Sequence, residues 1–92
     1  MKTPRPESSG YPQIDLHGLS VEEAVARVDR FIQHEFVRGR HWVKVVHGNG
    51  SGALRSAVRK HLSGSPLVKH TEAGLGVEGG AGVLIVTLED RT

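Results

Sequence analysis

Residues 42–55 read Trp-Val-Lys-Val-Val-His-Gly-Asn-Gly-Ser-Gly-Ala-Leu-Arg, and this stretch decides the fold. Its first five residues are rich in β-branched and aromatic side chains, which predicts a strand. The glycines of 48–52 then end the strand in a turn. Apolar residues recur at helical spacing after the turn, which predicts a helix. A strand followed at once by a helix is typical of an α/β protein. The apolar face of that helix comprises Leu54, Ala57, Val58, His61 and Leu62.

The rest of the chain extends the same pattern. Residues 12–17 predict a short strand, and Ser20 with Glu23 forms a capping-box signature at the start of a helix that Gly39 ends. Two more strands are expected at 67–72 and 83–88, with a mobile glycine-rich loop at 73–82 between them. The order β-α-β-α-β-β predicts an α+β two-layer sandwich: one mixed four-stranded sheet, two helices on one face and the other face open.

Length and composition narrow the class of protein. The 92 residues are enough for one domain. Residues 1–11 carry Pro, Ser and Gly and almost nothing apolar, so we expect a disordered arm there and the folded domain at 12–90. The absence of cysteine excludes disulfides and thiolate metal sites and fits a reducing compartment. No apolar run approaches the roughly 18 residues of a membrane span. We therefore expect a cytoplasmic protein, monomeric as an isolated domain, without membrane contact.

The charge of the chain is uneven although its formal net value is only +2. Residues 27–60 contain eight Lys or Arg against two acids, whereas the acids dominate after residue 71. A basic middle suits an anionic partner such as nucleic acid. The alternative is that these residues form the solvated faces of two helices.

Two predicted strands end in similar residues, Asp15-Leu16-His17-Gly18 and His47-Gly48-Asn49-Gly50. If the strands are parallel neighbours, both ends lie at the edge of the sheet where open α/β sheets bind ligands. Asp15 and His17 would share one face, where the carboxylate can hold the imidazole tautomer or share its proton. The alternative is a half-buried strand that merely exposes two polar residues.

The loop that follows His47 predicts an anion site. Glycines let the backbone fold closely, and a helix N-terminus favours negative charge. We expect phosphate to be held by residues 48–51 and by Arg55, which can clamp it with two hydrogen bonds. The spacing matches neither the nucleoside-triphosphate loop nor the dinucleotide fingerprint. The alternative is a flexible turn without a ligand. The expected phosphate-binding residues are Gly48, Asn49, Gly50, Ser51 and Arg55.

Alternation in the strand at 42–46 places Trp42 and Lys44 on the open face of the sheet. An indole beside a cation would form a stacking platform with a phosphate contact for nucleic acid. The alternative is a Trp42 packed under the N-terminal arm. His61, on the apolar face of the second helix, is expected to be a partly buried histidine with a polar partner rather than a catalyst.

Three ordered motifs resemble the Smr (small MutS-related) domain over about residues 13–88. Residues 14–19, Ile-Asp-Leu-His-Gly-Leu, resemble the family's Leu-Asp-Leu-His-Gly opening, residues 47–55 its His-Gly-x-Gly motif, and residues 79–88 its closing Gly-Gly-x-Gly strand. The resemblance implies a fold similar to the C-terminal domain of translation initiation factor three, and a nuclease that nicks DNA or cuts RNA. It implies a MutS-like ATPase as parent chain or partner, or a stand-alone protein, and a role in DNA repair, recombination or ribosome quality control.

The leading hypothesis is therefore an endonuclease with Asp15, His17 and His47 as catalytic residues. On RNA the 2′-hydroxyl can attack without a metal, whereas on DNA a water must attack and Mg²⁺ or Mn²⁺ becomes more useful, with Asp15 as the one candidate ligand. The alternative is a non-catalytic module that binds structured or branched DNA or RNA. A third reading is a site for a small phosphate compound. The sequence leaves the choice between DNA and RNA open.

Overall fold

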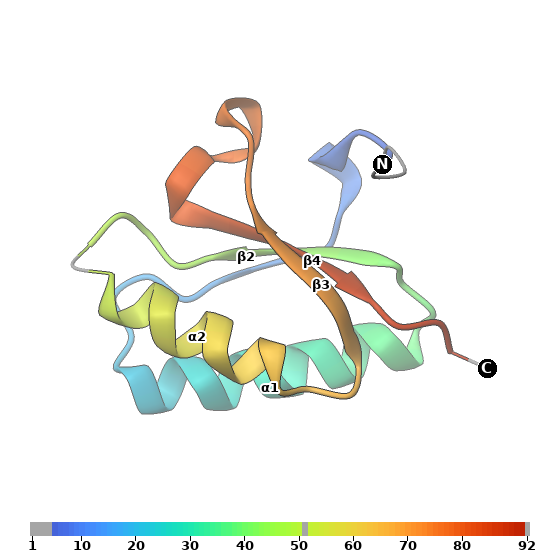
Figure 1. Cartoon of the computed structure of the whole chain (residues 1–92), viewed down its shortest axis with the longest axis horizontal. Coiled ribbons are helices and arrows are strands. Elements are labelled where there is room, and N and C mark those ends of the chain that lie inside the picture. Colours follow the sequence, from blue (N-terminus) through green and yellow to red (C-terminus); the bar gives the residue numbers. More distant parts are fainter. Residues whose placement is uncertain (1–4, 51, 92) are drawn as a thin grey trace.

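The computed structural model describes residues 5–50 and 52–91 and shows a four-stranded mixed sheet with two helices on one face (Figure 1). The predicted fold class and the order of helices and strands are confirmed. The glycine-rich segment before the last strand contains two short 3₁₀ turns. The elements are β1 (Gln13–Asp15), α1 (Val21–Val37), β2 (Trp42–Val46), α2 (Ala53–Ser63), β3 (Val68–Ala73) and β4 (Val83–Leu88), with 3₁₀ turns at Ser8–Gly10, Gly76–Glu78 and Gly80–Gly82.

The strands lie in the order β1-β2-β4-β3. β1 and β2 are parallel, with Asp15 opposite Val46, so their carboxyl ends lie side by side. β4 is antiparallel to both β2 and β3. β3 forms an edge of the sheet, and its pairing with β4 is irregular between Val68 and His70. This topology brings the two histidine-containing strand ends to one edge of the sheet.

The core lies between the sheet and the helices, and Leu16 connects it to the functional edge. Leu16 is fully buried although it follows the last residue of β1, and its backbone N–H donates to the carbonyl of Val46 at 2.7 Å. Its neighbours Asp15 and His17 are exposed. The remaining core residues are Ala24, Val28, Ile32, Val43, Val45, Val58, Leu62, Leu84, Val86 and Leu88.

The two helices begin in different ways. At the start of α1 the Ser20 hydroxyl accepts a hydrogen bond from the Glu23 N–H at 3.2 Å, and the Glu23 carboxylate accepts one from the Ser20 N–H at 3.3 Å. This is the predicted capping box. α2 begins after Gly52, whose φ is 92°, without a side-chain cap from any described residue and without an acid in its first turn. The positive end of the α2 dipole therefore has no acidic side chain in its first turn to complement it.

The N-terminal segment crosses the face of the sheet that the sequence predicts to be open (Figure 1). Ser8 is buried, and the ring of Tyr11 stacks on Trp42 at 6.0 Å between centroids. The Arg5 guanidinium donates to both carboxylate oxygens of Glu78, one of them at 2.7 Å. Residues 5–11 thus have defined contacts where composition predicts a disordered arm, because a partner 73 residues away cannot be read from local composition. Residues 1–4 of that arm lie outside the described residues.

Among the described residues, neither helix is both long and apolar enough to cross a membrane.

Candidate functional site

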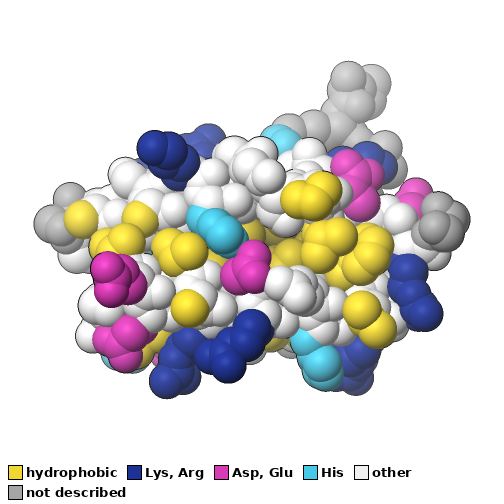
Figure 2. All heavy atoms as spheres, turned by 90° about the horizontal axis from the view of Figure 1, so that it is seen from below, with side chains coloured by type: hydrophobic (Ala, Val, Ile, Leu, Met, Phe, Trp, Pro, Cys, Tyr) yellow, Lys and Arg dark blue, Asp and Glu magenta, His cyan; other side chains and the backbone are white. Residues whose placement is uncertain are grey.

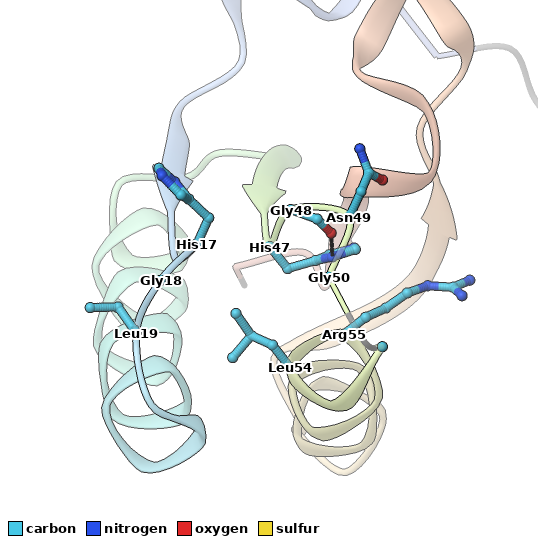
Figure 3. A pocket seen from close by; sticks show the side chains of 10 residues that line it. His17, Gly18, Leu19, His47, Gly48, Asn49, Gly50, Leu54 and Arg55 are labelled. Atoms are coloured by element: carbon cyan, nitrogen blue, oxygen red, sulfur yellow. Dashed lines mark hydrogen bonds between the residues drawn. The ribbon is translucent and has the colours of Figure 1, made fainter.

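A cleft of about 380 Å³ opens at the edge of the sheet where β1 and β2 end, between the first turns of the two helices (Figure 3). The turn after β1 contributes one wall, and the glycine loop with the start of α2 contributes the other. The two strand-end motifs therefore meet, as the sequence predicts. The lining residues are His17, Gly18, Leu19, His47, Gly48, Asn49, Gly50, Gly52, Leu54 and Arg55.

Asp15 orients His17. Its Oδ1 accepts a hydrogen bond from the His17 backbone N–H at 3.0 Å and lies 2.6 Å from His17 Nδ1. The side chain of His17 is 70% exposed. A carboxylate can only accept, so Nδ1 carries a proton and Nε2 faces solvent. The hydrogen bond from His17 lowers the pKa of Asp15, which therefore stays ionised near neutral pH. This is the tautomer-holding pair that the sequence suggests.

His47 is held in the opposite environment. The residue is 4% exposed, and its Nδ1 lies 2.8 Å from the carbonyl oxygen of Gly48. Because that carbonyl accepts, Nδ1 carries the proton and Nε2 is an acceptor. Nε2 is buried and has no hydrogen-bond partner among the described residues. Burial lowers the pKa of His47, and repulsion from Arg55 adds to the effect. The ring is therefore neutral at pH 7.

The third motif anchors the glycine loop. The backbone N–H groups of His47 and Gly48 both donate to the carbonyl oxygen of Gly82, at 3.0 and 3.1 Å. The Gly48 amide is thus turned away from the cleft, contrary to the expectation that it holds phosphate. The amides of Asn49 and Gly50 make no hydrogen bond to another described residue. Ser51 lies outside the described residues. The role of the Gly82 carbonyl is missed by the sequence analysis, although the Gly-Gly-x-Gly pattern marks the segment.

Gly48 also brings the two motifs into contact. Its φ is +83°, and a Cβ at this position would lie 3.2 Å from the Cβ of His17. Glycine therefore serves two purposes here: it adopts a left-handed conformation, and it lets the loop approach the exposed histidine closely. A side chain at this position would push against His17.

Arg55 is among the residues that line the cleft, and its side chain projects from the first turn of α2 on the side away from His17 (Figure 3). Its Nε is buried and has no hydrogen-bond partner among the described residues. An arginine in the first helical turn is unfavourable for the helix dipole but well placed for an anion that binds there. The unpaired Nε, the positive end of the α2 dipole and the amides of Asn49 and Gly50 make this wall electropositive. Its chemistry suits a phosphate.

The described residues provide few ligands for a divalent cation. No group of three or more His, Cys, Asp or Glu side chains gathers among them. Asp15, the candidate ligand from the sequence, already accepts two hydrogen bonds from His17. A Mg²⁺ or Mn²⁺ ion prefers several oxygen ligands, so this donor set does not fit one well.

Trp42 and Lys44 lie away from the cleft. They belong to the face of β2 opposite the buried Val43 and Val45, and Tyr11 covers the indole. This arrangement is the alternative in which Trp42 packs under the N-terminal segment. His61 also has the partner expected of it, since its Nε2 lies 2.9 Å from Asp29 Oδ1.

Comparisons with known proteins agree with this geometry. The family model for the Smr domain matches residues 14–89. Endonuclease MutS2 of Thermomicrobium roseum is 49% identical over 78 residues, which is 85% of this chain and 10% of that protein. Endonuclease MutS2 of Symbiobacterium thermophilum is 42% identical over 79 residues, which is 86% of this chain and 10% of that protein. The chain thus spans about a tenth of these curated relatives.

Solved structures give the same result. The Smr domain of Thermus thermophilus MutS2 superposes with a TM-score of 0.82 at 36% identity, covering 85% of this chain and 98% of that one. YdaL, a stand-alone small MutS-related protein from Escherichia coli, superposes with a TM-score of 0.83 at 29% identity, covering 90% of this chain and 70% of that one. The SMR domain of NEDD4-binding protein 2 superposes with a TM-score of 0.66 at 27% identity and covers 97% of each chain.

Proposed function

This chain belongs to the Smr domain family. From that membership and from its cleft, we propose that it is a nuclease domain. The phosphodiester bond that it cleaves would lie in the cleft that His17 and Arg55 line. One observation carries the proposal: an exposed histidine, held by a carboxylate 2.6 Å away, stands in one cleft with Arg55, whose Nε has no hydrogen-bond partner among the described residues. Such a site can hold a phosphate and move a proton next to it. Relatives of the chain bear the name endonuclease MutS2.

The environments of the two histidines suggest their roles. His47 is neutral with a bare Nε2, so it is suited to accept a proton. Asp15 occupies Nδ1 of His17, so Nε2 is the ring nitrogen that faces outward, and His17 is assigned the complementary role of proton donor. On RNA, His47 would take the proton of the 2′-hydroxyl as its oxygen attacks phosphorus. His17 would protonate the departing 5′-oxygen, which leaves a 2′,3′-cyclic phosphate.

Charge that develops on the phosphoryl oxygens would be stabilised by the loop amides of Asn49 and Gly50 and by Arg55. His47 Nε2 lacks a hydrogen-bond donor, and Arg55 Nε lacks an acceptor. A hydroxyl group of the substrate can serve as a donor to the first and as an acceptor for the second. Because Nε2 of His47 is covered in the free protein, the proposal requires the loop that starts at Gly48 to shift when substrate binds. On DNA no 2′-hydroxyl is available, so a water would have to attack phosphorus.

The test uses labelled single-stranded and structured RNA and DNA, with EDTA or Mn²⁺, followed by analysis of the product ends. A 2′,3′-cyclic phosphate formed in EDTA supports the metal-free route, and a 5′-phosphate formed only with Mn²⁺ supports attack by water. His17→Ala should slow cleavage by roughly 10²–10⁴-fold. His34→Ala, an exposed histidine outside the cleft, is the matched control. Unchanged cleavage by a His17→Ala, His47→Gln double variant overturns the catalytic assignment.

A second candidate is a binding module that holds structured nucleic acid without cutting it. The covered Nε2 of His47 favours this candidate, because a proton-transfer group is covered in the free protein while the amides of Asn49 and Gly50 have no partner among the described residues. A clear gel shift with no product in either EDTA or Mn²⁺ would support binding alone. In either case the domain would act by itself or as part of a longer MutS-like chain in DNA repair.

A further inference from the structure

A second groove, of about 330 Å³, lies outside the cleft between α2 and the edge strand β3. Three of its side chains are basic, namely Arg59, Lys69 and His70, and all three are exposed. None of the residues that line it is acidic, and these three have no ion-pair partner among the described residues. The groove is therefore a surface of one charge sign with nothing in the described chain to neutralise it. Its other lining residues are Ser63, Val68 and Thr71.

A bulge in β3 creates this cluster. The pairing with β4 passes from Val68–Leu88 directly to His70–Thr87, so Lys69 is an extra residue in the strand. In a regular strand Lys69 and His70 would point to opposite faces. A bulge redirects side chains, and here both residues line the same groove.

The groove continues the cleft. Arg59 follows Arg55 by four residues, so the two lie on the same side of α2, about 6 Å apart along the helix axis. Arg55 lines the cleft and Arg59 lines the groove. One turn of helix is close to the separation of neighbouring phosphates in a single strand. A row of cations therefore leads from the cleft across α2 to Lys69.

The surface formed by the two helices differs from this row. Lys and Arg side chains there lie among Asp, Glu and apolar side chains (Figure 2). The groove between the helices contains Lys60 but also the Asp29 carboxylate, which pairs with His61 at 2.9 Å. A mixed surface of this kind does not track a polyanion.

We infer that the groove between α2 and β3 binds the sugar-phosphate backbone of a single strand that continues from the phosphodiester held in the cleft. The inference rests on the proposed function in taking nucleic acid as the ligand. Arg59 and Lys69 contact successive phosphates, and His70 adds a hydrogen-bond donor. One row of cations follows one backbone, which is how proteins hold single strands without reading their sequence.

The test compares Arg59→Gln/Lys69→Gln with Arg30→Gln/Lys60→Gln, a control that removes the same charge from exposed positions on the helical surface. The probes are fluorescein-labelled RNA and DNA single strands of about 20 nucleotides, longer than the span of such sites. Their binding is measured by anisotropy over a range of salt concentrations. Removal of two phosphate contacts should reduce the slope of log K against log salt by about 1.4, and the control should keep the wild-type slope. An unchanged slope, or equal losses in both pairs, overturns the inference.

Cleavage of a trinucleotide is measured in parallel. This substrate is too short to reach from the cleft into the groove, so its cleavage reports on the proposed function alone. Its rate should be the same in wild type and Arg59→Gln/Lys69→Gln. If wild type leaves the trinucleotide intact but the slope falls as expected, the nuclease proposal fails and the groove stands. If wild type cleaves the trinucleotide but binds neither labelled strand, the groove inference fails and the nuclease proposal stands.

Discussion

Glu78→Gln should destabilise the domain, because Glu78 carries a buried charge that fastens the N-terminal segment to the sheet. The Glu78 side chain is 5% exposed. Its carboxylate accepts hydrogen bonds from the Arg5 guanidinium and, at 2.9 Å, from the Leu75 N–H. The Arg5 pair lowers the pKa of Glu78 from 4.5 to about 2. Glutamine keeps the shape of the side chain but removes the charge that Arg5 recognises.

The size of the effect follows from the pKa. One pKa unit corresponds to about 1.4 kcal/mol, so the full shift would stabilise the folded state by about 3 kcal/mol at neutral pH. We expect about 2 kcal/mol, since Arg5 is 16% exposed and water screens part of the pair. The pKa is lower in the folded state, so the unfolded state binds the proton more readily. The stabilisation is therefore complete above pH 4.5 and is lost as the pH falls towards 2.

Urea unfolding followed by the fluorescence of Trp42, the single tryptophan, measures this difference. For an m-value within the usual 1–3 kcal/mol/M, the midpoint of Glu78→Gln should lie about 1 M below wild type at pH 7. The gap should close between pH 4.5 and pH 2. Glu89→Gln, a carboxylate with no ion pair among the described residues, should show no such gap. Equal midpoints at pH 7, or a gap that persists unchanged to low pH, would refute the reasoning.

Three further predictions concern the cleft. Gly48→Ala should lower the free energy of unfolding, measured by thermal unfolding, by about 1–2 kcal/mol and should slow cleavage, because φ at this position is +83° and the new Cβ would meet His17. Gly10→Ala, with open space around it, should have neither effect. The wild-type domain should lose stability as the pH falls below 6.5. The pKa of His47 is lowered in the folded state, so below pH 6.5 this ring binds a proton more readily in the unfolded state. An NMR titration that gives the His47 ring a pKa above 6.5 would contradict this. Leu16→Ala should cost about 2–5 kcal/mol in urea, and a wild-type midpoint would show that Leu16 does not anchor the site.

Patterns that lie within a few neighbouring residues were predictable from the sequence. The capping box at Ser20 and Glu23 forms as expected, since both partners lie within one helical turn. Val43 and Val45 are buried while Trp42 and Lys44 are half-exposed, as strand alternation requires. The meeting of Asp15, His17 and the His47 loop follows from the parallel pairing of two strands.

Contacts between distant residues were not predictable in this way. Arg5 pairs with Glu78, which is 73 residues away in the sequence, and the local composition of neither segment predicts this contact. The Gly82 carbonyl accepts a hydrogen bond from the Gly48 amide because β4, which follows Gly82, lies beside β2 in the sheet. The bulge that exposes Lys69 depends on how two strands pair, not on the residues of one strand. These features need the assembled sheet.

At the start of α2, the residue that would best stabilise the helix differs from the residue that would best bind an anion in the cleft. A glutamate in place of Arg55 would complement the helix dipole and stabilise α2 by about 0.3–1 kcal/mol, but it would also fill the anion site with a negative charge. Arg55→Glu should therefore unfold at no lower urea concentration than Arg55→Gln, while it binds labelled single-stranded RNA more weakly than either Arg55→Gln or wild type. If Arg55→Glu binds as wild type does, the anion is held elsewhere. If it is less stable than Arg55→Gln, the dipole at this terminus is already complemented, and the argument from the missing acid in the first turn fails.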